Sequence, residues 1–354
     1  IENIRNALPN PYHDFESKDW WHPEQLSVSN PTLNEEQLDR FHSDGFIVLD
    51  GLWPTTLIEQ ASLEVARLHP PQDVIKKGQK KHQVSSAMPW HEQKNDGGNI
   101  TSEWALNYMT INHRALAVIS QLLETDAINI RLSQSHIIAK YGAKIDGFND
   151  PNRIRISGDQ EMHVDYGNNT LMVPPRTSAP EAIACLSYYS NVNESGGATH
   201  FAQALPGELT SYSAEQFNPP GFVGVNGTFD FGPRSKENIE RLYEIEKPVY
   251  YKHGTCILYR LDTWHRGTPA ALGKIRYSHH HVWRHKNAEW VNWQSLAPKL
   301  SRMSNRYLEQ MSVLQRTVLG FAPPGNAYWT EETLNSVGQR YPGMDMTPYR
   351  KAKL

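Results

Sequence analysis

Two histidines and an aspartate constrain the fold of this chain more than any other feature. His163 and Asp165 lie two residues apart in the segment 162–166, and His265 follows much later, in the segment 263–267. On a β-strand, residues two apart project to the same side, whereas helical spacing separates them. If the three side chains meet, distant β-segments must be joined in one core.

Two imidazoles and one carboxylate are a ligand set that holds one face of Fe(II) and leaves three coordination positions open. We therefore predict a metal site on His163, Asp165 and His265. The apolar run Cys256–Arg260 predicts a buried strand, with His265 at its end. For His265 the alternative is a hydrogen-bonded histidine in a turn.

A His-x-Asp pattern alone discriminates poorly and is most often a solvated or structurally paired histidine. The chain contains a second copy of the pattern, His42-Ser43-Asp44. That copy falls at the end of a predicted helix, where the two side chains would point apart. It is therefore not expected to bind a metal.

Arg276 lies in a run with β character, residues 275–283. Burying a guanidinium is costly unless it meets an anion in bidentate geometry. On a strand Ser278 shares the face of Arg276. The pair can hold a distal carboxylate, such as the 5-carboxylate of 2-oxoglutarate. An internal Asp or Glu, or solvent, would be the alternative partner of Arg276.

The three consecutive histidines that follow cannot act together as ligands. Strand alternation places His280 on the face of Arg276, and His279 and His281 on the other face. We expect His279 and His281 to be surface or packing residues. His280 is a candidate for the wall of a pocket.

Several segments resemble the phytanoyl-CoA dioxygenase superfamily of Fe(II)- and 2-oxoglutarate-dependent oxygenases. Residues 36–52 look like the opening helix, glycine and strand of that family, and residues 191–199 resemble its glycine turn between core strands. Residues 261–267, followed by Arg276, are similar to the segment that carries its distal histidine and co-substrate arginine.

The resemblance implies a mainly β fold with flanking helices, built on a double-stranded β-helix (a jelly roll of cupin type). It also implies Fe(II) on His163, Asp165 and His265, with dioxygen as oxidant. The co-substrate 2-oxoglutarate would bind Arg276 and Ser278. Gln134 resembles a family position that faces the co-substrate or substrate.

The expected reaction is hydroxylation of an unactivated C–H bond of a small-molecule metabolite, with release of succinate and CO2. Asp165 fills the position that related halogenases leave open for chloride. Trp90, Tyr166 and Tyr188 suggest an aromatic substrate lining, together with His280. Two alternatives remain: a cupin-type isomerase or lyase that does not use 2-oxoglutarate, and a non-catalytic metal-binding relative. Arg276 discriminates against the former.

Three parts are expected along the chain. Residues 1–31 read as an irregular N-terminal arm. Residues 32–286 would form the oxygenase domain, with a helical part at 32–125 and the jelly-roll core at about 128–286, where short β-rich runs alternate with Gly and Pro breaks. Residues 287–354 would be an extension of helix and loop, packed on the core.

Within the helical part, residues 32–35 read as a capping box that begins at Thr32, and Gly45 suits the residue just past the helix. A second helix is expected after Pro54, and a third over residues 115–123. In the extension, residues 300–319 have a helical pattern.

Composition excludes several classes of protein. The formal net charge of −3 over 354 residues carries no general electrostatic signature of nucleic-acid binding. Cys185 and Cys256 each lie in an apolar run, where a cysteine usually acts as a small buried hydrophobe, so no disulfide framework is implied. No stretch resembles a leader or a membrane span, and the cytoplasm is the expected location.

Overall fold

A computed structural model describes much of the chain. The described residues are 24–25, 32–69, 83–87, 93–94, 100–101, 104–142, 144–145, 155–156, 160, 162–163, 165, 180–202, 241–288, 309–326, 329 and 331–351. Most of the expected N-terminal arm therefore lies outside the described residues, as do Trp90 and Tyr166.

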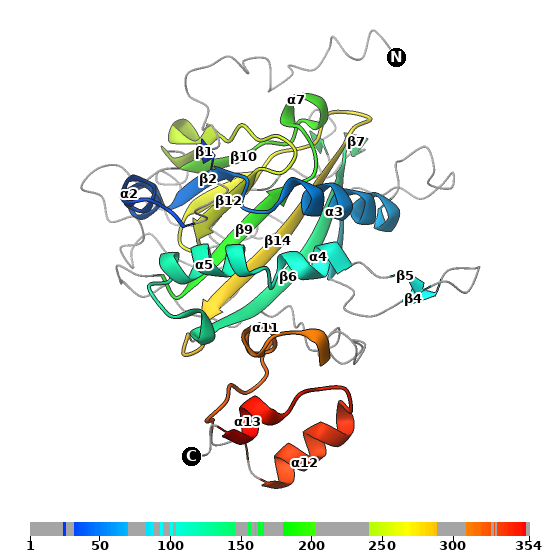
Figure 1. The fold of residues 1–354 in the computed structure, drawn as a ribbon. Helices are drawn as coiled ribbons and strands as arrows, with labels where there is room; N and C mark the ends of the chain where they lie inside the picture. The colour runs from blue at the N-terminus through cyan, green and yellow to red at the C-terminus, as the bar shows by residue number, and fades with distance from the viewer. Residues whose placement is uncertain are drawn as a thin grey trace, which may run out of the picture.

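Two facing β-sheets form the centre of the molecule (Figure 1). The larger sheet has seven strands in the order β1-β2-β12-β9-β14-β6-β3, and every pairing in it except β1 with β2 is antiparallel. Its strands are β1 (Glu24–Gln25), β2 (Phe46–Asp50), β3 (Gln83–Ala87), β6 (Ile130–Tyr141), β9 (Ala182–Tyr188), β12 (Cys256–Arg260) and β14 (Ile275–His285).

The smaller sheet has the order β11-β10-β13, and both of its pairings are antiparallel. Its strands are β10 (Thr199–Ala202), β11 (Lys247–Pro248) and β13 (Trp264–Gly267). Two short pairs, β4 (Gln93–Lys94) with β5 (Ile100–Thr101) and β7 (Lys144–Ile145) with β8 (Arg155–Ile156), lie outside both sheets. The predicted mainly β, jelly-roll fold with flanking helices is confirmed.

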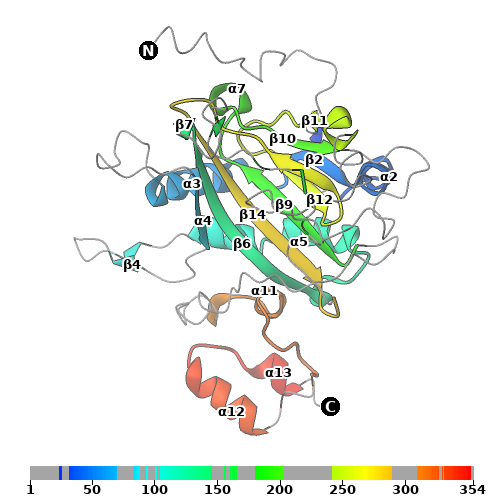
Figure 2. The same cartoon turned by 180° about the vertical axis from the view of Figure 1, so that it is seen from behind.

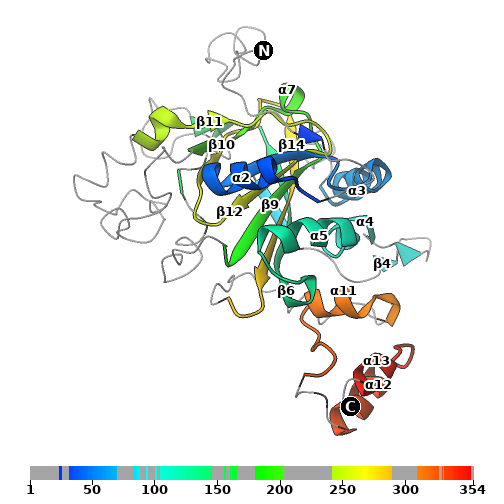
Figure 3. The same ribbon diagram turned by 60° about the vertical axis from the view of Figure 1, so that its left-hand side comes forward.

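Helices cover one face of the larger sheet (Figure 3). Those on this face are α3 (Thr55–Leu68), α4 (Trp104–Met109) and α5 (His113–Leu122), whereas α2 (Glu35–Asp44) lies beside β2. The other described helical segments are η1 (Ala127–Asn129), α7 (Val192–Ser195), α11 (Val313–Val318), α12 (Glu331–Arg340) and α13 (Thr347–Lys351). Seen from behind, α12 and α13 lie beyond α11 at one end of the molecule (Figure 2).

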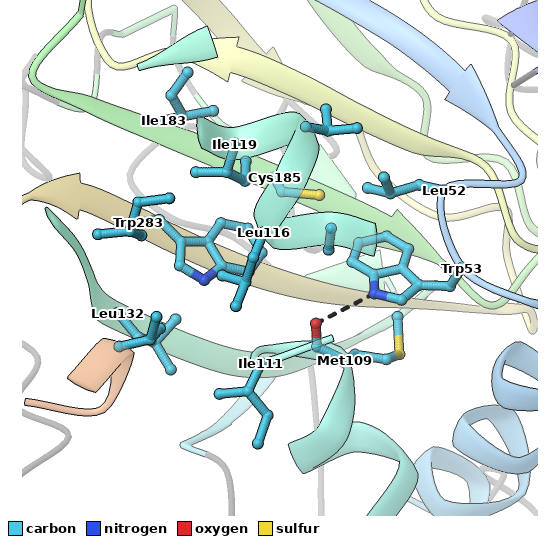
Figure 4. Packing of buried hydrophobic residues seen from close by; sticks show 14 of the residues in the cluster. Leu52, Trp53, Met109, Ile111, Leu116, Ile119, Leu132, Ile183, Cys185 and Trp283 are labelled. Carbon is cyan, nitrogen blue, oxygen red and sulfur yellow. Dashed lines mark hydrogen bonds between the residues drawn. The ribbon is translucent and has the colours of Figure 1, made fainter. Parts of the chain in front are cut away.

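The largest hydrophobic cluster fills the space between the sheet and these helices (Figure 4). Trp53 and Trp283 are both buried in it, and their indole N–H groups donate to the carbonyl oxygens of Met109 and Thr110, at 3.2 Å and 3.0 Å. Each large apolar side chain buried here stabilises the fold by roughly 1.5–3 kcal/mol. The opposite face of the larger sheet faces the smaller sheet, and the cavity described below lies between them.

The first helix begins at a different residue from the one predicted. Its N-cap is Asn34, whose side chain accepts from the Gln37 backbone N–H while the Gln37 side chain accepts from that of Asn34, both at 2.9 Å. The capping box that was expected at Thr32 is wrong by two residues, because the required glutamine stands three residues after Asn34. Gly45 ends the helix as predicted, with φ +81°.

The other predicted helices differ mainly at their ends. The second follows Pro54 as expected, and the third begins at His113, two residues early, because Asn112 caps it. The pattern over residues 300–319 yields only α11 and a short helical stretch at 309–310 in its described part. None of the described helices combines the length and apolar character needed to cross a membrane.

Candidate metal centre

His163 and His265 lie on paired backbone segments. The two residues exchange backbone hydrogen bonds of 3.0 Å and 2.9 Å, and the Gln160 N–H donates to the Gly267 carbonyl oxygen at 3.0 Å. This pairing places the His163 segment beside β13, at the edge of the smaller sheet. It brings together two histidines that are far apart in sequence.

The expectation that His265 ends the strand 256–260 is wrong. His265 lies on β13, which belongs to the smaller sheet, whereas β12 belongs to the larger one. A turn separates the two strands, and in it the Arg260 guanidinium pairs with both carboxylate oxygens of Asp262, at 2.9 Å and 3.0 Å. The chain crosses between sheets at this buried ion pair.

Asp165 also departs from the predicted geometry, because its backbone is helical and not extended. Its carboxylate nevertheless meets both histidines. Oδ1 lies 3.8 Å from Nε2 of His163, and Oδ2 lies 3.8 Å from Nε2 of His265. One ligand atom from each of the three residues falls within 4.8 Å of the others. The convergence therefore depends on tertiary contacts and not on alternation along one strand.

Tyr259 on β12 holds the carboxylate in place. Its hydroxyl group donates to Oδ2 of Asp165 at 2.8 Å, and the side chain is only 2% exposed. Burial, and then the nearby Asp165 carboxylate, raise the pKa of Tyr259 well above its usual value, so the phenol stays a neutral donor. This role of Tyr259 was not predicted, since a tyrosine in an apolar strand has the pattern of a core residue.

The orientation of His265 is fixed by its own turn. Nδ1 lies 2.9 Å from the Thr263 carbonyl oxygen, which requires the proton on Nδ1 and leaves the Nε2 lone pair toward Asp165. The Thr263 hydroxyl group in turn donates to the Gly45 carbonyl oxygen at 2.8 Å. A side chain at Gly45 would overlap Thr263 Oγ1. The glycine after α2 thus allows the turn that orients His265.

Arg276 is buried without an acidic partner among the described residues. It is 3% exposed, and its Nη1 donates to the Gly197 carbonyl oxygen. Gly197 has φ +76°, and a Cβ there would lie 3.1 Å from Arg276 Cδ, so the glycine makes room for the arginine. Within the described part of the chain, Arg276 Nε has no hydrogen-bond partner, and neither has the hydroxyl group of Ser278, which is fully buried. Unpartnered buried polar groups are uncommon and require an explanation.

One cavity of about 180 Å³ connects the metal-site residues with Arg276, and Ser278 is not among the residues that line it. The metal-site residues and Arg276 line it together with polar residues that include Gln134, Gln160, Thr199, Tyr259 and His280. Its apolar wall consists of Ile138, Ala184, Leu186 and Val282. The structure thus brings Gln134 and His280, both predicted from the sequence, to the same space as the triad.

Tyr188 does not line this cavity in the described part of the chain. It is fully buried, stacks on Tyr251 with 3.7 Å between ring centroids, and shares a 2.6 Å hydrogen bond with Thr199. The Arg276 guanidinium carbon lies 5.9 Å from its ring centroid. Tyr188 therefore supports Arg276 from the core.

The alternation predicted for the histidine run is found, but neither outer histidine is at the surface. His279 is fully buried and His281 is 1% exposed. His281 packs between Trp53 and Trp283, at ring-centroid distances of 5.8 Å and 5.0 Å, on the helix-covered face. The expected packing role is therefore confirmed, whereas the expected surface position is wrong because that face of β14 lies under helices and not in solvent.

No protein-family model and no curated protein matches the sequence. Solved structures do match. The non-heme alpha ketoglutarate dependent carbocyclase SnoK, from nogalamycin biosynthesis, is 13% identical with a TM-score of 0.52, over 79% of this chain and 94% of that one. This likeness shows the fold.

Two further solved structures are similar. HygX from Streptomyces hygroscopicus, with nickel and 2-oxoglutarate bound, is 14% identical over 74% of this chain and 90% of its own, with a TM-score of 0.47. EctD from S. alaskensis, with bound Fe, is 14% identical over 75% and 81%, with a TM-score of 0.46.

Proposed function

We propose that this chain is an Fe(II)- and 2-oxoglutarate-dependent dioxygenase that hydroxylates an unactivated C–H bond of a small-molecule metabolite. One observation carries the proposal. His163, Asp165 and His265 line a single cavity with Arg276, a buried cation that has no acidic partner among the described residues. The fold shared with SnoK and the sequence resemblance to the phytanoyl-CoA dioxygenase superfamily both support it.

The triad suits iron by its donor set. Two imidazoles and a carboxylate are the facial ligands of non-heme Fe(II) oxygenases, and His265 already directs Nε2 toward the shared centre. With 2-oxoglutarate and dioxygen, the bound metal supplies oxidation in which one oxygen atom enters the substrate as hydroxyl and the other enters succinate as CO2 leaves.

The remaining residues bind and shield the reactants. Arg276 and Ser278 provide the unpartnered donors for the distal carboxylate of 2-oxoglutarate. Tyr259 keeps the Asp165 carboxylate facing the two histidines. The apolar wall, which includes Leu186 and Val282, limits water around the reacting groups.

A cupin-type metalloenzyme that does not use 2-oxoglutarate gives no role to Arg276, which lines the cavity, is buried and has no acidic partner among the described residues. The decisive experiment is anaerobic addition of Fe(II) and then 2-oxoglutarate to the metal-free protein. We expect a weak visible charge-transfer band of the chelated keto acid only when both are present. Equal turnover with 2-oxoglutarate omitted would refute the proposal.

Arg276→Ala is expected to raise the 2-oxoglutarate KM at least tenfold while leaving Fe(II) affinity unchanged. Removing one partner of a buried charged contact costs about 2–5 kcal/mol, and each 1.4 kcal/mol is a factor of ten. Arg276→Lys should recover only part of the loss, because lysine keeps the charge without the guanidinium fork. Succinate release, measured against 2-oxoglutarate concentration, gives the KM.

Arg284→Ala is the matched control for Arg276, since Arg284 lies on the same strand, is not among the residues that line the cavity, and donates to the backbone carbonyl oxygens of His285 and Lys286. Its KM should equal that of the wild type. An unchanged KM in Arg276→Ala would remove the arginine from the co-substrate site.

Tyr259→Phe is expected to weaken Fe(II) or Co(II) binding by about 10–100-fold, the usual effect of losing a group that orients a metal ligand. The hydroxyl group that holds Oδ2 of Asp165 is lost, while the ring remains in the core. Anaerobic titration calorimetry of the metal-free protein measures the change. Tyr189→Phe, a buried tyrosine whose hydroxyl group contacts His279, serves as the control. Equal metal affinity in Tyr259→Phe and wild type would deny this role.

A further inference from the structure

Two histidines face each other across neighbouring strands on the cavity side of the larger sheet. His280 on β14 and His136 on β6 are direct partners in the antiparallel register. His280 lines the cavity, and so do Gln134 and Ile138, which flank His136 on the same face of β6. Across such a pair the Cβ atoms are about 4.5–5.5 Å apart.

Each imidazole carries a buried nitrogen that has no hydrogen-bond partner among the described residues. His136 is 8% exposed, and its Nδ1 has no hydrogen-bond partner. His280 Nε2 is likewise buried without a hydrogen-bond partner among the described residues. A buried polar atom without a partner lowers stability, so such atoms require an explanation.

The neighbouring His279 is a histidine on the same strand whose two ring nitrogens both have hydrogen-bond partners within the fold. It is fully buried, as deep as any residue of the sheet, yet Nε2 lies 2.8 Å from Ser135 Oγ and Nδ1 lies 3.2 Å from the Tyr189 hydroxyl oxygen. Both of its nitrogens are satisfied within the fold. Among the described residues, His136 Nδ1 and His280 Nε2 lack such a contact; His280 lines the cavity, and His136 lies on the same face of the sheet between Gln134 and Ile138, which also line it.

Their surroundings keep both rings neutral. Burial lowers the pKa of His136 to about 4. Burial, followed by the nearby Arg276 guanidinium and by His136, Lys140 and His265, lowers the pKa of His280 well below its usual value. A neutral imidazole offers one N–H donor and one acceptor lone pair.

We propose that His136 and His280 form a substrate subsite that recognises uncharged hydroxyl groups. This inference rests on the proposed function and adds a substrate class to it. A hydroxyl group both donates and accepts, as neutral imidazoles require. A carboxylate accepts only, and Arg276 on the same face would attract it instead. An ammonium group donates only and would be repelled by the nearby cations Arg276 and Lys140.

The subsite is separate from the place proposed for the co-substrate carboxylate. His280 lies two residues beyond Ser278 and four beyond Arg276 on β14, and each pair of residues advances a strand by about 6.8 Å. Val282 and Leu186 line the cavity beside it. The subsite therefore suits a molecule with an apolar body and hydroxyl groups on neighbouring carbon atoms.

The first test compares the thermal unfolding of ligand-free variants. His136→Phe and His280→Phe each remove an unsatisfied nitrogen, so Tm should stay level or rise. His279→Phe breaks two hydrogen bonds, and Tm should fall by about 2 °C or more. If His136→Phe and His280→Phe lower Tm as much as His279→Phe, the pair is structural and the subsite is refuted. His136→Gln and His280→Gln repeat the test where phenylalanine does not fit.

The second test uses three probes on one carbon skeleton, namely cyclohexane-1,2-diol, cyclohexanecarboxylate and cyclohexylamine. Binding is followed by saturation-transfer NMR on protein loaded with Zn(II) and 2-oxoglutarate. The diol should bind the wild type most tightly, and its affinity should fall at least tenfold in His136→Phe and His280→Phe. A diol that binds no better than the other probes, or equally to the variants, overturns the subsite.

The oxygenase activity and the hydroxyl subsite can be tested separately. The anaerobic charge-transfer band of Fe(II) and 2-oxoglutarate should persist in both histidine variants, because neither residue belongs to the triad or the arginine site. Absence of that band from the wild type would refute the oxygenase. A normal band with no preference for the diol would refute only the subsite.

Discussion

Replacing Asp165 with alanine is expected to abolish metal-dependent succinate production. The change removes the only carboxylate of the described donor cluster and leaves two neutral imidazoles. It also leaves the Tyr259 hydroxyl group without its acceptor. A loss of about 4 kcal/mol or more, within the range expected for a metal that stabilises developing charge, lowers the rate about a thousandfold. Succinate release and metal content after anaerobic loading both measure the effect.

The chain supplies its own control for this substitution. Asp44 belongs to a second His-x-Asp pattern, at the end of α2, and its carboxylate accepts from Ser43 Oγ at 2.9 Å. Asp44→Ala should cost some stability but leave metal content and succinate yield per folded protein unchanged. Full turnover in Asp165→Ala would show that the triad does not carry the reaction.

The residue types of the site could be predicted because they follow from ligand chemistry and strand alternation. Arg276, Ser278 and His280 were expected on one face of an extended segment, and β14 places them there. Alternation is a property of the local backbone, so it can be recognised without knowing the partners of a strand.

Alternation fails where a strand is irregular. On β6, Gln134 pairs with Val282, but Leu132 pairs with Trp283, so Ser133 is an extra residue between them. Leu132 packs in the helix-covered core, whereas Gln134 lines the cavity. Simple two-residue spacing would place both on one face. A bulge of this kind is set by pairing with the neighbouring strand, which the sequence of β6 alone does not reveal.

Tertiary contacts decided the rest of the site. The helical backbone at Asp165 and the step from β12 to β13 before His265 both contradict the local patterns. In each case a hydrogen bond fixes the side chain. The Tyr259 hydroxyl group holds Asp165. The Thr263 carbonyl oxygen orients His265, and the Thr263 side chain is itself hydrogen-bonded to Gly45. Such partners come from distant segments, and their own sequences look like ordinary core or turn.

Acidification below pH 6.5 is expected to destabilise the protein steeply. On β6 and β14, His136, His279 and His281 are buried and His280 is half-buried. Desolvation is the largest cause that lowers the pKa of each: to about 4 for His136, to about 3 for His281, and well below the usual value for His279 and His280. In the unfolded chain each titrates near its ordinary pKa of about 6.5. Between these values the unfolded state binds more protons than the folded state.

The free energy of unfolding therefore falls as the pH falls through this range. The contribution of these histidines to stability is complete above pH 6.5 and is lost as pH falls toward their folded pKa values. Each histidine contributes a slope of up to about 1.4 kcal/mol per pH unit, so four together reach roughly 5 kcal/mol per pH unit at most. Urea unfolding at pH 7.5, 6.5, 5.5 and 4.5 measures the free energy of unfolding across this window.

A single substitution separates the histidines from the carboxylates that also titrate in acid. His281 packs on the helix-covered face, and neither of its nitrogens has a hydrogen-bond partner in the segments that the structure describes. His281→Phe removes one buried group that must stay neutral, so the slope below pH 6 should become shallower by about one proton, or about 1.4 kcal/mol per pH unit. Stability at pH 7.5 should change much less, because the histidine is already neutral in both states there. An identical slope in the variant and the wild type would assign the acid sensitivity to other groups.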